Sequence, residues 1–119
     1  MPNIQIDLDR DLFDSHGDEL SAAIHQAQID ALDIPADDLF QVFNPHGPGE
    51  LRFDPTYGGV DRQRLVQIRI IMVHMHSVAA KQRLFAAIVE HLGRVGVRAE
   101  DILIAVVENG FEDWYAGKL

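Results

Sequence analysis

The chain has 119 residues, of which 47% are hydrophobic and 24% are charged, and this composition is typical of one ordinary globular domain. Its 19 acidic and 10 basic residues leave a formal charge of −9, so the basic surface of a nucleic-acid-binding protein is missing. No apolar run approaches the roughly 18 residues of a membrane span, and the absence of cysteine excludes disulfides and thiolate chemistry and fits a cytoplasmic protein.

The first half of the chain predicts a strand, a helix and a second strand. Residues 3–9, "NIQIDLD", alternate apolar and polar side chains, which is the pattern of a half-buried strand. Ser15 and Asp18 form a capping-box pattern, so we expect a helix to begin there and to end before Pro35. Residues 38–44, "DLFQVFN", are rich in β-forming side chains and predict the second strand.

The second half of the chain predicts the same order of elements. A loop rich in Pro and Gly, residues 45–62, comes first, and we expect one short strand within it around residues 50–53. Residues 65–74 predict a long strand that is apolar on both faces near its end, which favours a central place in a sheet. Residues 77–96 predict a helix, and residues 101–109 predict the last strand.

Two short segments indicate that the chain is a tandem duplication. "IPADDL" (residues 34–39) and "VRAEDI" (residues 97–102) share the order aliphatic, any residue, Ala, acid, Asp, aliphatic. Each segment follows a predicted helix and opens a predicted strand, and the spacing is about 63 residues. We therefore predict a single domain of two β-α-β units, over about residues 2–44 and 64–109. Each unit requires a parallel strand pair with a right-handed crossover helix.

The chain opens with Met1-Pro2 directly ahead of the first predicted strand. Removal of the initiator Met ahead of a small residue such as Pro is expected to leave Pro2 as a free secondary amine. Such an amine serves as a general base, a nucleophile or a general acid, depending on its pKa. Pro is also common at this position without any catalytic role, so the residue by itself leaves both interpretations open.

Together with the duplicated plan, these residues make the sequence resemble the tautomerase superfamily, and most closely its malonate semialdehyde decarboxylase branch. The resemblance covers nearly the whole chain, and its most specific part is the Glu-Asn-x-x-x-Asp-Trp pattern within residues 106–117. The segments that carry it are "MPNIQID" at the start, "IPADD" (34–38), "HGPG" (46–49), the turn at 58–62 and "VVENGFEDWYAG" (106–117). It implies an α/β (α+β) tautomerase-like fold, with a four-stranded mixed sheet and two helices on one face, and a homotrimeric assembly.

The resemblance also implies a set of site residues. Pro2 matches the catalytic proline, which in the decarboxylase polarises the carbonyl of a 3-oxo acid as a cation or forms an imine with it. Asp38 matches an acid that orients water or substrate, although it is also an ordinary turn residue, since Asp101 holds the equivalent place without a proline beside it. Trp114 matches an apolar wall of the site, with packing or a subunit contact as its alternative. Arg62 lies in the matching turn and is a candidate substrate-binding residue, with surface ion pairing as its alternative.

Residues 73–77, "VHMHS", depart from the family pattern. Where the decarboxylases carry Arg-Pro-Arg before a helix-capping serine, this chain has His-Met-His before Ser77. A protonated histidine holds a carboxylate but cannot form the two-pronged contact of an arginine. We therefore name His74 and His76 as substrate-binding or acid–base residues. The alternatives are a polar strand end and a metal pair, which would need a further ligand such as His46.

The function expected from the resemblance is that of a metal-free and cofactor-free enzyme acting through Pro2 on a small carbonyl acid. The reaction would be decarboxylation, hydration or keto–enol tautomerisation, and the lost arginines favour tautomerase activity or another substrate over decarboxylation. The alternative is a protein of the same fold that binds a partner or serves a structural role. A retained Met1 would favour that alternative, because it would block the amine of Pro2.

Overall fold

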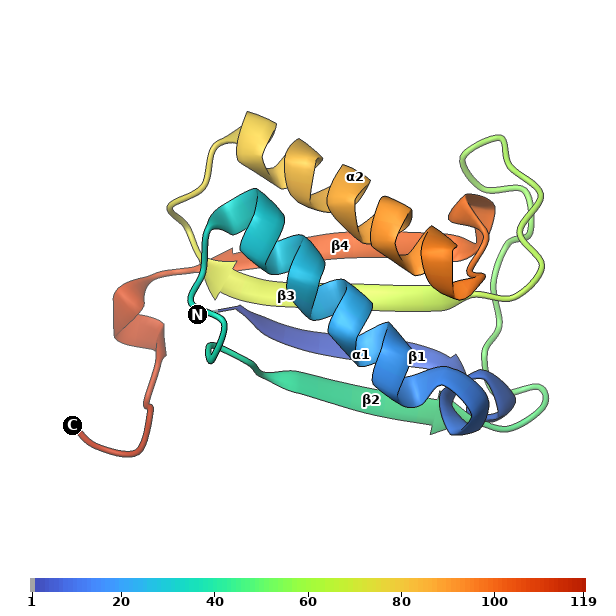
Figure 1. The fold of residues 1–119 in the computed structure, drawn as a ribbon, viewed down its shortest axis with the longest axis horizontal. Helices are drawn as coiled ribbons and strands as arrows, with labels where there is room; N and C mark the ends of the chain where they lie inside the picture. The colour runs from blue at the N-terminus through green and yellow to red at the C-terminus, as the bar shows by residue number, and fades with distance from the viewer. Residues whose placement is uncertain (1) are drawn as a thin grey trace.

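The structure is a four-stranded sheet with two helices packed on one of its faces (Figure 1). The computed structural model describes residues 2–119, so the expected removal of Met1 concerns a residue outside the described ones. The elements in chain order are β1 (Asn3–Asp9), α1 (Arg10–Leu32), β2 (Gln41–His46), β3 (Val66–Val73), α2 (Val78–Val95), the short 3-10 helix η1 (Ala99–Asp101), β4 (Ile102–Asn109) and the 3-10 helix η2 (Phe111–Asp113).

The strand order β2-β1-β3-β4 confirms the predicted duplication. β1 and β2 are parallel and are joined through α1, and β3 and β4 are parallel and are joined through α2. β1 and β3 are antiparallel, and they bring the two units together at the middle of a mixed sheet. β3 is an interior strand, as its continuous apolar run predicted.

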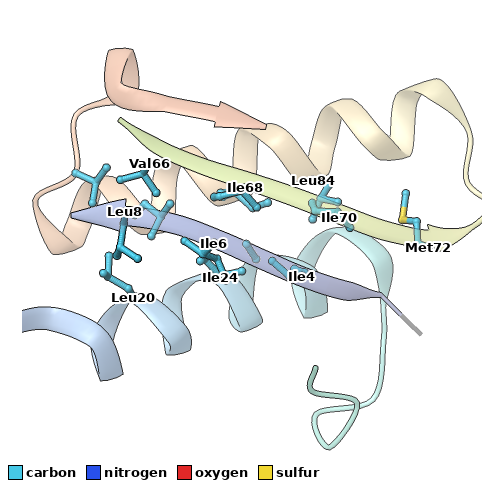
Figure 2. Close-up of a cluster of buried hydrophobic side chains, with 14 residues drawn as sticks. Ile4, Ile6, Leu8, Leu20, Ile24, Val66, Ile68, Ile70, Met72 and Leu84 are labelled. Carbon is cyan, nitrogen blue, oxygen red and sulfur yellow. The ribbon is translucent and has the colours of Figure 1, made fainter. Parts of the chain in front are cut away.

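The core lies between the sheet and the two helices (Figure 2). β1 and β3 place alternate apolar side chains on the helix face, and each helix adds a stripe at helical spacing. The labelled members in Figure 2 come from both units: Ile4, Ile6, Leu8, Leu20, Ile24, Val66, Ile68, Ile70, Met72 and Leu84. Each fully buried aliphatic side chain of this kind contributes about 1.5–3 kcal/mol relative to an exposed one. The core therefore holds the strand ends in fixed positions.

α1 begins earlier than the sequence predicted. Its first residue is Arg10, directly after β1, and the hydroxyl of Ser15 donates to the carbonyl oxygen of Asp11 at 2.7 Å instead of capping a helix. At His16 the backbone leaves helical geometry, with φ −137° and ψ 17°, so the helix is kinked there. The capping-box signal therefore marked the kink within α1, while the start of the helix was set by the end of β1.

Two loop predictions were also wrong. No strand forms at residues 50–53, which lie in turns and irregular chain. β2 begins three residues later than expected, at Gln41, and continues through Pro45 to His46. Because β2 is an edge strand that pairs only with β1, one side of its backbone needs no partner and a proline is tolerated.

α2 follows the prediction closely at both ends. The N–H of Ala80 donates to the hydroxyl of Ser77 at 3.1 Å, which caps the start of the helix. Gly96 ends it with φ 103°, a left-handed conformation that favours glycine. Among the described residues, the helices are too short or too polar to cross a membrane.

Candidate active site

The sheet topology brings Pro2 to the same end of the sheet as His74. β1 and β3 are antiparallel, with Asn3 opposite Ile71, so the start of β1 lies beside the end of β3. Pro2 immediately precedes β1 and is buried, and His74 immediately follows β3. Figure 1 shows the start of β1 beside the arrowhead of β3. We call this the amino end of β1.

The other two strands carry further residues to the amino end of β1. β2 is parallel to β1, and the N–H of Ile4 donates to the carbonyl oxygen of Phe40 at 2.9 Å, so the segment holding Asp38 lies at this end. β4 is parallel to β3, and the N–H of His74 donates to the carbonyl oxygen of Asn109 at 2.7 Å. The chain after Asn109 therefore leaves the sheet at this same end.

Trp114 is held at this end by the residue that closes β4. Its indole N–H donates to the side-chain oxygen of Asn109 at 2.8 Å, and the side chain of Trp114 is partly buried. The carboxylate of Asp113 accepts the N–H of Gly110 at 2.8 Å, which stabilises the short turn between them. Asn109 and Asp113, two residues of the Glu-Asn-x-x-x-Asp-Trp pattern, therefore hold the segment that follows β4 in place through hydrogen bonds.

The two histidines lie beyond the strand that was predicted to reach residue 74. β3 ends at Val73, so His74 and His76 both lie in the connection to α2, where the alternation of a strand no longer applies. His46 is at the opposite end of the sheet, opposite Asp9 in the register, and its Nε2 contacts the carboxylate of Asp7 at 2.8 Å. It therefore cannot complete a metal site with the other two histidines of its own chain.

His74 belongs to a network of charged side chains. Its Nδ1 lies 2.7 Å from one carboxylate oxygen of Glu108, at the end of β4, and Nζ of Lys81 donates to the other oxygen at 2.7 Å. The hydrogen bond from Lys81 is the main cause that holds the pKa of Glu108 below its ordinary value, and the contact with His74 acts in the same direction. Glu108 is therefore an ionised acceptor at neutral pH.

Arg62 lies at the opposite end of the sheet from Pro2. It precedes β3, it is buried, and its Nη1 donates to the carbonyl oxygens of Asp54 at 3.0 Å and Tyr57 at 3.2 Å. The guanidinium therefore orders the loop between β2 and β3. Within one chain, the structure does not bring Arg62 together with Pro2.

The comparison with protein families decides what this fold is. A family model described as "Tautomerase enzyme" matches residues 38–117, more than half of the chain. This chain belongs to the tautomerase family. The match includes both histidines after β3 and the whole segment from β4 to Trp114.

Individual relatives of this chain agree with that assignment. The probable tautomerase YusQ of Bacillus subtilis (strain 168) is 33% identical over 119 residues, which cover 98% of this chain and 94% of that protein. Among solved structures, the FG41 malonate semialdehyde decarboxylase inhibited by 3-bromopropiolate matches with a TM-score of 0.90 and 34% identity, over 97% of this chain and 88% of that one. The asymmetric trimer of a wild-type fused 4-OT (F6) matches with a TM-score of 0.82, over 98% and 94% of the two chains. At 17% identity, this last match concerns the fold alone.

Glu108 and Lys81 were not predicted as site residues from the sequence. Glu108 is the first residue of the Glu-Asn-x-x-x-Asp-Trp pattern, so a signal was present, but nothing in the pattern showed which residue it would contact. Lys81 lies in the first turn of α2, where its backbone N–H donates to the carbonyl oxygen of Ser77. The parallel pairing of β3 with β4 brings these side chains together.

Proposed function

We propose that this tautomerase acts through Pro2 as a cofactor-free enzyme on a small carbonyl acid, by decarboxylation, hydration or keto–enol tautomerisation. The observation that carries the proposal is the convergence, at the amino end of β1, of four chain segments. These segments hold Pro2, Asp38, the two histidines and Trp114. The similarity to a malonate semialdehyde decarboxylase structure at 34% identity supports the substrate class.

The chemistry of the proposal follows from the secondary amine that removal of Met1 would leave at Pro2. In its cationic form, an N–H donates to the carbonyl oxygen of a 3-oxo acid. The bond to the carboxylate carbon then breaks, its electron pair moves into the enol, carbon dioxide leaves and the carbon takes up a proton. In its neutral form, the amine takes a proton from the carbon beside the carbonyl and delivers it to the oxygen of the resulting enolate, which gives the enol, and the reverse transfer returns the keto form.

The duplication supports a role for Asp38 beside that amine. The equivalent residue, Asp101, is buried, and its carboxylate accepts the N–H groups of Gln63 at 2.7 Å and Arg64 at 3.1 Å, just ahead of β3. Once Met1 is removed, a chain that starts at Pro2 has no such N–H groups ahead of β1. The carboxylate of Asp38 is then available to the amine of Pro2, to water or to the substrate.

The two histidines and Trp114 complete the proposed site. His74 and His76, when protonated, would hold the carboxylate of the substrate through hydrogen bonds from the imidazolium rings. Trp114 would form an apolar wall that limits the access of water. Arg62 is not included, because its guanidinium is used by the loop at the other end of the sheet.

We propose that three chains assemble through the face of the sheet that the helices leave open. This face exposes apolar side chains on both edge strands, among them Val42 on β2 and Leu103 and Val107 on β4. Exposed apolar patches of this kind mark protein contacts, and a fused 4-OT of the same fold is a trimer. Sedimentation should give a trimer for the wild type and a smaller species for Val107→Glu, whereas a wild-type monomer would contradict the assembly.

The direct test compares turnover by the wild type and by Pro2→Ala, with intact-mass measurement of both mature proteins. We expect the mature wild type to lack Met1, and Pro2→Ala to turn over malonate semialdehyde or the enol of phenylpyruvate more slowly, on the order of 100-fold. Asp38→Ala should lose activity to a similar degree. Equal turnover by wild type and Pro2→Ala, or a mature protein that keeps Met1, would favour the alternative of a tautomerase-fold protein that binds without catalysis.

A further inference from the structure

Glu108 lies where three segments meet at the amino end of β1. It stands opposite Met72 in the pairing of β3 with β4. One of its carboxylate oxygens contacts Nδ1 of His74, in the connection after β3, and the other accepts Nζ of Lys81 from the first turn of α2, both at 2.7 Å. The side chains of Lys81 and Glu108 are only 20% and 22% exposed, so water competes weakly for this ion pair.

The contact with Glu108 determines which ring nitrogen of His74 carries a proton. An ionised carboxylate only accepts hydrogen bonds, so Nδ1 of His74 must be the donor. The other ring nitrogen, Nε2, is then a donor when the imidazole is charged and an acceptor when it is neutral. The side chain of His74 is 76% exposed, so Nε2 is accessible to a molecule that approaches this end of the sheet.

We propose that Glu108 is a positioning residue for His74, and that Lys81 holds the carboxylate of Glu108 in place, so that Nε2 of His74 is the atom that meets the substrate. This inference rests on the proposed function, because it assigns the orientation of a residue in the same site. It does not require Glu108 or Lys81 to touch the substrate.

The network also suits the expected class of substrate. With His74 protonated, the three side chains carry a net positive charge, which attracts a small oxo acid with one carboxylate. With His74 neutral, Nε2 offers a lone pair that can take a proton from the substrate or from water. Among the described residues, the titratable side chains near this end of the sheet include Asp37, Asp38 and His76, together with Glu112 and Asp113 beyond β4, and the amine of Pro2 joins them once Met1 is removed.

The role of Glu108 is tested by nitrogen-15 NMR of the histidine rings in the full-length protein. At a pH where the imidazole is neutral, we expect wild-type His74 to carry its proton on Nδ1. In Glu108→Gln, Nζ of Lys81 needs the amide oxygen as its hydrogen-bond acceptor, so the amide NH2 group faces Nδ1 of His74. Because an NH2 group only donates, Nδ1 must accept, and the proton of the neutral imidazole should move to Nε2. Wild-type His74 with its proton on Nε2, which free imidazole side chains prefer, would overturn the inference.

Two further variants show whether the effect comes from this network. Lys81→Met leaves the Glu108 carboxylate unanchored, so His74 should show a mixture of the two tautomers. Glu90→Gln is the matched control, because Glu90 also forms an ion pair on α2, with Arg94 at 2.6 Å, but lies outside the site. A tautomer change in Glu90→Gln, or none in Glu108→Gln, would contradict the role of Glu108.

Activity measurements separate this inference from the proposed function. We expect Glu108→Gln to lower kcat/KM by about 10-fold or more and to change its pH profile, because Nε2 would then hold its proton in the neutral imidazole. If Pro2→Ala loses activity while Glu108→Gln keeps the wild-type tautomer and pH profile, only the positioning role fails. If Pro2→Ala keeps full activity, the proposed function fails, and the NMR result still decides the orientation of His74.

Discussion

Asp38 in the first β-α-β unit and Asp101 in the second hold matching positions in the repeated segments, although Asp101 directly precedes β4 and Asp38 lies three residues ahead of β2. Asp101 is buried, and it accepts two backbone N–H groups from the chain that leads into β3. Asp38 is only partly buried, and under the proposed function the removal of Met1 would leave it without equivalent backbone N–H groups ahead of β1. Asp101 therefore has a structural role, and the proposed function assigns a chemical one to Asp38.

The core is the part of the molecule in which the two units should behave alike. Leu20 of α1 and Leu84 of α2 are both fully buried in the same cluster between helices and sheet. We expect Leu20→Ala and Leu84→Ala each to lower the free energy of unfolding by about 3 kcal/mol, because each leaves a cavity. Urea unfolding monitored by circular dichroism measures both, and a difference of several kcal/mol between them would show that one unit dominates the stability.

The two aspartates should differ in stability as they differ in contacts. Asp101→Ala leaves the N–H groups of Gln63 and Arg64 without their acceptor, so we expect the free energy of unfolding to fall by about 2 kcal/mol. Asp38→Ala should change it by less than about 0.5 kcal/mol, although it lowers activity. A large loss of stability in Asp38→Ala would mean that both aspartates are structural, and the contrast between the units would be lost.

The serines expected to cap the two helices provide a smaller contrast. Ser77 accepts the N–H of Ala80, whereas the hydroxyl of Ser15 donates to the carbonyl oxygen of Asp11 and contacts Nδ1 of His16, and so does not cap α1. Ser77→Ala should therefore cost about 1 kcal/mol of unfolding free energy, and Ser15→Ala much less. Thermal unfolding of the two variants measures this difference, and equal shifts would show that the geometry at Ser77 contributes nothing to stability.

The smallest predicted effect concerns the residues that end β2 and β4. The hydrogen bond with Asp7 raises the pKa of His46 above its ordinary 6.5, with a further contribution from Glu50. Protonated His46 therefore stabilises the fold below its unfolded pKa, and this contribution is lost as the pH rises through the raised pKa of the folded state. The stability difference between wild type and His46→Gln should be larger at about pH 6 than at about pH 9.

Asn109 is the matched control for that pH dependence. It ends β4 as His46 ends β2, and its side-chain oxygen accepts the indole N–H of Trp114, but an amide does not titrate. The stability cost of Asn109→Ala should therefore be the same at both pH values. A cost that varied with pH for Asn109→Ala, or a constant one for His46→Gln, would contradict the assignment of the effect to the contact between His46 and Asp7.

Local patterns in the amino-acid sequence determine much of this fold. The alternation in β1, the apolar run of β3, the cap at Ser77 and the repeated segments ahead of β2 and β4 predicted the duplicated plan, and the structure confirms it. These features depend on periods of two and 3.6 residues and on backbone hydrogen bonds between near neighbours. The start of α1 and the course of β2 through Pro45 depend on neighbouring strands, so the sequence pattern placed them wrongly.

In the candidate site, too, the sequence predicted some features and only the tertiary structure decided others. Residue types and order named Pro2, Asp38, His74, His76 and Trp114, but could not show that Arg62 lies at the opposite end of the sheet. The sequence pattern also could not show that Glu108 contacts both Lys81 and His74, because Lys81 is 27 positions and His74 is 34 positions from Glu108 along the chain. Only the pairing of β3 with β4 and the packing of α2 bring these charges together, since contacts between distant segments are decided by the register of the sheet.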